Sequence, residues 1–119
     1  KTYMKNNVDK CKNTIILDVE TNCEKGQIIQ ISYMIFDEKY HLIKTFNKYV
    51  KDRLVSIKSL EVNKINNFTL RLKGESFDSI MKELILDLFE CKVIVGHNIS
   101  SDIRVINKNY SFNINSLLF

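Results

Sequence analysis

The sequence has few of the residues that interrupt helices and strands (proline and glycine) or form disulfide cross-links (cysteine). Its 119 residues include no proline, three glycines and three cysteines. The cysteines (Cys11, Cys23 and Cys91) are odd in number and form no CxxC pair, which excludes the common zinc and redox-disulfide motifs. Free thiols are typical of a reducing compartment, so we expect a cytoplasmic or other reducing intracellular location.

Long apolar runs are also missing. None approaches the ~20 residues that a membrane helix needs, so we expect no membrane segment. Residues 1–13 are polar and contain no h-region of a signal peptide, and we interpret them as a solvated N-terminal arm. The sequence begins with Lys rather than Met, so we expect a piece of a longer product. The remaining residues, 14–119, suit one domain, and an apolar content of 45% is enough to build its core.

Positive charge is concentrated in the middle of the chain. The net charge is +4, and residues 39–73 hold nine basic residues against two acidic ones. A basic region of this kind predicts a polyanionic partner such as nucleic acid. An ordinary solvated lysine face is the simpler explanation of this composition taken alone.

Four segments have the composition of β-strands. Residues 14–20, "TIILDVE", form a short apolar run that turn residues follow. Residues 28–37 are rich in β-branched and aromatic side chains, and residues 41–50 alternate in part. These three segments predict an antiparallel meander, and residues 92–96, "KVIVG", predict a fourth strand.

Helical spacing is clearest in residues 76–90, where Ser76 is a candidate N-cap. Seven apolar residues define one face there, which core packing explains better than a cofactor site: Phe77, Ile80, Met81, Leu84, Ile85, Leu88 and Phe89. Residues 56–65 and 100–109 also predict helices. Because the fourth strand follows a helix, we expect it to lie parallel to an earlier strand. The fold class is therefore α/β: a mixed sheet, with a three-stranded antiparallel meander and one parallel strand, flanked by helices.

Two acidic residues close the first predicted strand. Asp18 and Glu20 are two positions apart, so they point to the same side of the sheet and repel each other unless a cation neutralises them. Paired carboxylates suit Mg²⁺ or Mn²⁺. A solvent-facing pair at a strand end is the simpler alternative.

A polar cluster follows the fourth predicted strand, in "VIVGHNISSD" (93–102). Asp102 lies where binding sites form in open α/β sheets, just beyond the carboxyl end of a strand. Helix capping by Asn98 and the residues after it accounts for the same pattern, and His97 suits a structural role. If the two strands are parallel neighbours, Asp102 joins Asp18 and Glu20 at one sheet edge. Three carboxylates beside a basic surface predict a two-metal phosphodiester site.

The sequence resembles the DEDD, or DnaQ-like, 3′–5′ exonucleases. "ILDVETN" (16–22) is similar to their first motif and "VIVGHNISSD" to their second, in the family's order. The resemblance implies a ribonuclease H-like fold and two Mg²⁺ or Mn²⁺ ions. It implies hydrolysis of phosphodiesters from the 3′ end of DNA or RNA, with a polymerase or another domain of a longer chain as a possible partner. The carboxylates implied as catalytic and metal-binding are Asp18, Glu20 and Asp102, and the residues implied to contact substrate are Thr21, Asn22, His97 and Asn98.

The sequence departs from the family pattern in two places. Cys23 stands near the position where the family commonly has glycine. The third motif, which brings a fourth carboxylate and a His or Tyr general base, is absent, since no Asp, Glu or His follows Asp102. We therefore expect a partial exonuclease domain, incomplete at its C-terminal side and weak or inactive alone. A catalytically inactive module that binds nucleic acid or a protein partner is one alternative, and an unrelated α/β domain is another.

Overall fold

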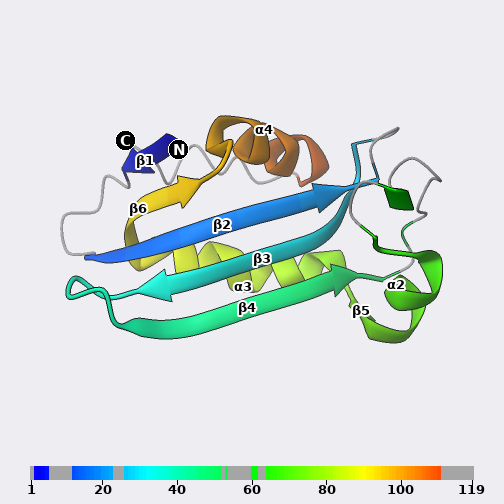
Figure 1. Cartoon of the computed structure of the whole chain (residues 1–119), viewed down its shortest axis with the longest axis horizontal. Helices are drawn as coiled ribbons and strands as arrows, with labels where there is room; N and C mark the ends of the chain where they lie inside the picture. Colours follow the sequence, from blue (N-terminus) through cyan, green and yellow to red (C-terminus); the bar gives the residue numbers. More distant parts are fainter. Residues whose placement is uncertain are drawn as a thin grey trace.

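The fold is a mixed sheet with two longer helices on it (Figure 1). The computed structural model describes residues 2–5 (as backbone), 12–22, 26–51, 53, 60–61 and 64–110. Six strands form one sheet in the order β1-β6-β2-β3-β4-β5. This arrangement confirms the predicted α/β class with a ribonuclease H-like sheet. In the described part, no helix is both long and apolar enough to span a membrane.

The antiparallel meander forms as predicted. Strands β2 (Asn13–Thr21), β3 (Ile28–Phe36) and β4 (Leu42–Val50) pair in sequence. Strand β6 (Cys91–Gly96) pairs with β2 in parallel, with Ile15 opposite Ile94. The predicted crossover therefore exists, and it brings the carboxyl ends of β2 and β6 to the same region of the sheet.

Three short elements were not predicted. Strand β1 (Thr2–Lys5) pairs antiparallel with β6, inside the segment that we interpreted as a polar arm. Helix α2 (Asn67–Lys73) and the two-residue strand β5 (Gly74–Glu75) connect β4 to the next helix. The helix predicted over residues 56–65 lies mostly outside the described residues, although Leu60 and Glu61 are helical.

Helix α3 (Phe77–Phe89) begins after Ser76, whose side chain accepts a hydrogen bond from the backbone N–H of Ser79. Its predicted apolar face packs into the main core, which confirms the packing interpretation: Ile80, Met81, Leu84 and Leu88 are buried. Phe89 was wrongly included in that face. Its side chain is 47% exposed, because it stands at the last helical position before the chain turns into β6.

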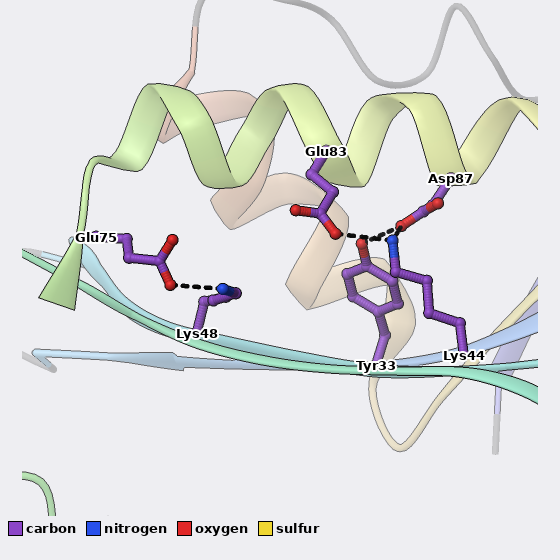
Figure 2. Close-up of polar contacts among 6 residues, drawn as sticks. All are labelled: Tyr33, Lys44, Lys48, Glu75, Glu83 and Asp87. Atoms are coloured by element: carbon purple, nitrogen blue, oxygen red, sulfur yellow. Dashed lines mark hydrogen bonds and ion pairs between the residues drawn. The ribbon is translucent and has the colours of Figure 1, made fainter. Parts of the chain in front are cut away.

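Polar contacts join α3 to the sheet beneath it. The Nζ atom of Lys44 on β4 lies 2.6 Å from Asp87 Oδ2 and 2.7 Å from Glu83 Oε2, and the Tyr33 hydroxyl donates to Asp87 (Figure 2). Burial alone would lower the pKa of Lys44, but hydrogen bonds from its ammonium to Asp87 and Glu83 outweigh burial and raise it. Lys48 pairs with Glu75 on the same face at 2.6 Å. Two cations of the basic region are therefore neutralised within the fold.

Candidate carboxylate site

Helix α4 (Ile99–Asn109) carries Asp102 in its first turn. The helix is placed by Ile99, Ile103 and Ile106, which are buried in the main core. Asn98 occupies the N-cap position but makes no side-chain capping hydrogen bond. The capping alternative for Asn98 is therefore wrong in this structure, and its exposed amide stays available to a ligand.

Strand alternation separates the two acidic residues of β2 from the core. Ile15 and Leu17 are buried in the core that α3 covers, so Asp18 and Glu20 point to the opposite face. Asp18 is exposed and Glu20 is partly buried. The pairing between β2 and β3 shifts by one residue after Glu20, at Thr21, which ends the regular strand next to the acidic pair.

Asp102 lies close enough to both β2 carboxylates to interact with them electrostatically. Its pKa is raised from 3.8 to about 6, first because the carboxyl is partly buried and then because Asp18 and Glu20 add negative charge. These three carboxylates, predicted to converge, therefore share one electrostatic environment. Within the described ranges, however, no three His, Cys, Asp or Glu side chains form a group that could hold a metal ion.

Gly96 allows the close approach of β6 to β2 beside this site. A Cβ atom at this position would lie 3.0 Å from the carbonyl oxygen of Leu17 and 3.2 Å from Ile99 Cδ1. A side chain would therefore push the start of α4, and Asp102 with it, away from β2. Sequence reasoning marked Gly96 only as the end of a strand.

His97 and Asn98 form the turn between β6 and α4, and both are exposed. They precede the first turn of α4, which carries Asp102. Thr21 is partly buried at the end of β2. The structure therefore leaves these three residues in positions compatible with the predicted contacts to substrate.

Asn22 has a different environment. Its side chain is 3% exposed, its Nδ2 donates to Gln27 Oε1 at 3.1 Å, and its Oδ1 accepts from the backbone N–H of Gln27 at 3.1 Å. The backbone N–H of Asn22 also donates to the Gln27 carbonyl at 2.9 Å. These contacts indicate that Asn22 closes the β2–β3 connection, while its predicted contact with substrate stays a prediction.

Asn109 is a residue that the sequence did not single out. Its Oδ1 accepts from the backbone N–H of Ile28 at 3.1 Å, and its Nδ2 donates to the carbonyls of Gly26 and Val105 at 2.9 and 2.8 Å. One amide thus ties the end of α4 to the start of β3. An asparagine at the end of a helix carries no sequence signal for such a tertiary contact.

A polar row leads from Asp18 across the open face of the sheet. Asp18 pairs in register with Ser32, and Ser32 with Asn47. Asn47 Oδ1 accepts from the Ser32 hydroxyl at 2.9 Å and from Gln30 Nε2 at 2.6 Å. A shallow hollow of about 410 Å³ lies over this row, and Ile16 and Met34 contribute to its apolar lining. The carboxylates therefore border an exposed face with both apolar and polar groups.

The fold is similar to those of solved exonucleases. Exonuclease I in complex with the inhibitor BCBP has a TM-score of 0.73 and 18% identity, over 89% of this chain and 25% of that one. E. coli exonuclease I in complex with a dT13 oligonucleotide has a TM-score of 0.65 and 17% identity, over 82% of this chain and 24% of that one. Exonuclease X in complex with 5′ overhanging duplex DNA has a TM-score of 0.59 and 20% identity, over 77% of this chain and 52% of that one.

Comparison of the sequence with known families and proteins does not assign the chain to a family. No protein-family model matches the chain, and no curated protein matches it. The chain spans about a quarter of exonuclease I and about half of exonuclease X. At these identities the likeness shows the fold alone: a mixed sheet flanked by helices.

Proposed function

We propose that this chain is part of a metal-dependent 3′–5′ exonuclease domain of the DEDD type. The observation that supports this most is the shared electrostatic environment of Asp102, Asp18 and Glu20, which come from two distant motifs. The nuclease-like fold is consistent with it. The proposed substrate is the 3′ end of a DNA or RNA strand, and the proposed products are nucleoside monophosphates.

The donor chemistry at the site fits Mg²⁺ or Mn²⁺. Asp18, Glu20 and Asp102 offer only carboxylate oxygens, which these hard cations prefer, and a cation would relieve the repulsion that raises the pKa of Asp102. Two such ions, when bound, lower the pKa of an attacking water and stabilise the leaving 3′ oxygen. Because the described carboxylates do not yet form a joint metal-binding group, small side-chain movements must accompany binding.

The remaining residues of the proposed site position the substrate. In this proposal Thr21, at the end of β2, contacts the terminal nucleotide, and His97 and Asn98, in the turn before α4, contact the substrate beside it. Asn22 orients Thr21 indirectly, by closing the connection from β2 to β3. None of the residues after Asp102 is Asp, Glu or His, so this sequence offers no fourth carboxylate and no histidine base there.

Weak or absent hydrolysis by residues 1–119 alone is therefore part of the proposal. The second candidate is a catalytically inactive module that binds nucleic acid or a protein partner, which the basic region of residues 39–73 would also serve. A polymerase or another domain of a longer chain is the protein partner that we propose beside nucleic acid.

Metal binding and hydrolysis are tested separately. Mn²⁺ binding is measured by electron paramagnetic resonance for the wild type and for Asp18→Asn, Glu20→Gln and Asp102→Asn. We expect weak binding by the wild type and at least tenfold weaker binding by each variant. Hydrolysis is followed with a 5′-labelled oligonucleotide in Mg²⁺. If the wild type binds no Mn²⁺ at millimolar concentration, the metal site is contradicted. Robust stepwise hydrolysis that Asp18→Ala abolishes would contradict the weak activity that we expect of this chain.

A further inference from the structure

Helix α2 exposes two apolar side chains to solvent. Phe68 and Leu72 are each 66% exposed, although they belong to a short helix that packs on the sheet. They stand four positions apart, so they lie on the same side of the helix. An exposed aromatic ring beside an exposed leucine offers a flat apolar surface that the described part of the fold does not cover.

All the charged residues of the same segment are basic. Residues 64–73 contain Lys64, Arg71 and Lys73 and no acidic residue, and all three cations are exposed. Among the described residues, none of them takes part in an ion pair, whereas Lys44 and Lys48 are neutralised by acids of the fold. These exposed cations give the surface of α2 a positive charge, which attracts anionic partners.

The position of α2 relates it to the carboxylates. Leu70 is buried with Ile29 and Ile65 and against Tyr49, which anchors the helix to the sheet. Tyr49 pairs in register with Gln30, and Gln30 with Glu20. Two strand spacings separate Tyr49 from Glu20, or about 10 Å. Helix α2 also lies at the end of the sheet where β2 and β4 both end (Figure 1).

We propose that this surface, formed by Lys64, Phe68, Arg71, Leu72 and Lys73 and here called the α2 surface, binds a single strand of nucleic acid. Unpaired bases stack on Phe68 and Leu72, and the cations neutralise the phosphates. The assignment of the bound segment as the nucleotides just upstream of the 3′ end rests on the proposed function. Single-strand binding itself does not. Stacking and phosphate contacts do not distinguish one base from another, so we expect binding that is tolerant of sequence.

The test measures binding without cleavage. Fluorescence anisotropy follows 5′-fluorescein-labelled dT12 and rU12 oligonucleotides in EDTA, which removes divalent ions. We expect Phe68→Ala to weaken binding at least fivefold, as the loss of one base–aromatic stack implies, and Phe68→Trp to preserve it. The double variant Arg71→Ala, Lys73→Ala should lower the slope of log K against log salt by about 2, one for each lost phosphate contact.

Matched variants at the other end of the sheet serve as controls. Phe89→Ala removes another exposed aromatic ring, and Lys39→Ala with Lys92→Ala removes two other exposed cations. We expect these variants to bind as the wild type does, with circular dichroism showing that every variant is folded. Equal losses in Phe68→Ala and Phe89→Ala, an undiminished affinity in Phe68→Ala, or no binding by the wild type would each overturn the proposal.

Two further measurements separate this inference from the exonuclease proposal. Blunt duplex DNA presents no unpaired bases, so its binding should be insensitive to Phe68→Ala; equal sensitivity would count against stacking. Asp18→Asn should bind dT12 in EDTA at least as tightly as the wild type. If dT12 binding depends on Phe68 but the carboxylates bind no Mn²⁺, the α2 surface is supported and the exonuclease proposal is contradicted. If the carboxylates bind Mn²⁺ but the affinity for dT12 does not depend on Phe68, the exonuclease proposal is supported and the α2 surface is contradicted.

Discussion

Asp102 on α4 and Asp18 on β2 interact electrostatically, although the sequence places them near opposite ends of the chain. The parallel pairing of β6 with β2 brings their two strands together, and Gly96 permits the close approach. The repulsion between these carboxylates is a cost of the fold in the absence of a counter-ion. It is also measurable, because it changes how stability depends on pH.

The free energy of unfolding should fall as pH rises through the titration of Asp102. Its pKa is about 6 in the folded chain against an ordinary 3.8, so the folded state binds this proton more tightly than the unfolded state. The stability that the protonated carboxyl contributes is fully present below pH ~4 and is lost as pH rises to ~6. Asp102→Asn should therefore be more stable than the wild type at pH 7 by ~1 kcal/mol, a value reduced for solvent screening of a partly exposed group. Urea unfolding at pH 4 and pH 7 measures the difference.

Asp78 offers a control of opposite sign for that experiment. Hydrogen bonds from Lys82 and then from Tyr110 lower the pKa of this exposed carboxyl. Stability from Asp78 is therefore present above its unfolded pKa and is lost as pH falls through the folded pKa, so Asp78→Asn should not be stabilised at pH 7. If both variants gained stability at pH 7, a general charge effect would explain the result and the local repulsion at Asp102 would not.

Gly96→Ala should destabilise the chain and disturb the carboxylates. The new Cβ would meet the backbone oxygen of Leu17 at 3.0 Å, and backbone cannot move aside as a side chain can. We expect a loss of ~1–3 kcal/mol in the free energy of unfolding. The start of α4 should shift as well, so the pKa of Asp102, followed by NMR titration, should move back towards 3.8.

Gly26→Ala is the comparison for that variant. Gly26 has φ +64°, and apart from its chain neighbours no atom of the described residues lies within 4 Å of an added Cβ, so the expected cost is backbone strain of about 1–2 kcal/mol. We expect it to lower stability while leaving the pKa of Asp102 raised. A pKa of Asp102 unchanged in Gly96→Ala would show that Gly96 does not position α4.

Asn109→Ala should loosen the link between α4 and the β2–β3 connection. The substitution leaves the backbone N–H of the fully buried Ile28 and the Gly26 carbonyl without this partner. An unsatisfied buried donor costs ~1–3 kcal/mol, whereas Lys108→Ala at the exposed neighbouring position should cost less than ~0.5 kcal/mol. Urea unfolding gives both values. Hydrogen exchange of the Ile28 amide should speed up in Asn109→Ala, and unchanged exchange would mean that another group protects it.

Local patterns were enough to predict most of the sheet. Strands β2, β3, β4 and β6 and helices α3 and α4 lie within a residue or two of their predicted bounds, because alternation and helical spacing are recorded in consecutive side chains. Helix α2 escaped prediction because Leu70 is its only buried residue, so its sequence shows no apolar stripe. Strands β1 and β5 depend on pairing with distant backbone, which composition does not show.

Only those residues of the candidate site that belong to a recognisable sequence motif could be predicted. Asp18 and Glu20 lie near the end of β2, and Asp102 lies in the first turn of the helix that follows β6, so the electrostatic interaction among them follows from the parallel pairing that the sequence predicted. Asn109 and Gly96 act through contacts with residues far away in the sequence, which no local pattern encodes. The buried position of Asn22 was missed although its partner Gln27 is only five residues away, because no local pattern indicates that their side chains contact each other across the connection.

Lys44→Ala should destabilise the contact between β4 and α3. The Lys44 ammonium bridges Asp87 and Glu83, and the Asp87 side chain is only 15% exposed. Removing Lys44 leaves a mostly buried carboxylate with the Tyr33 hydroxyl as a neutral donor, so we expect a loss of ~1–3 kcal/mol. Lys82→Ala breaks an exposed pair with Asp78 and should cost much less than Lys44→Ala, because water screens the attraction between exposed charges. Urea unfolding at pH 7 compares the two, and adding Asp87→Asn to Lys44→Ala should recover part of the loss, because the unpaired charge is then gone. Equal costs for the two lysines would show that the Lys44 bridge is as weak as a surface pair.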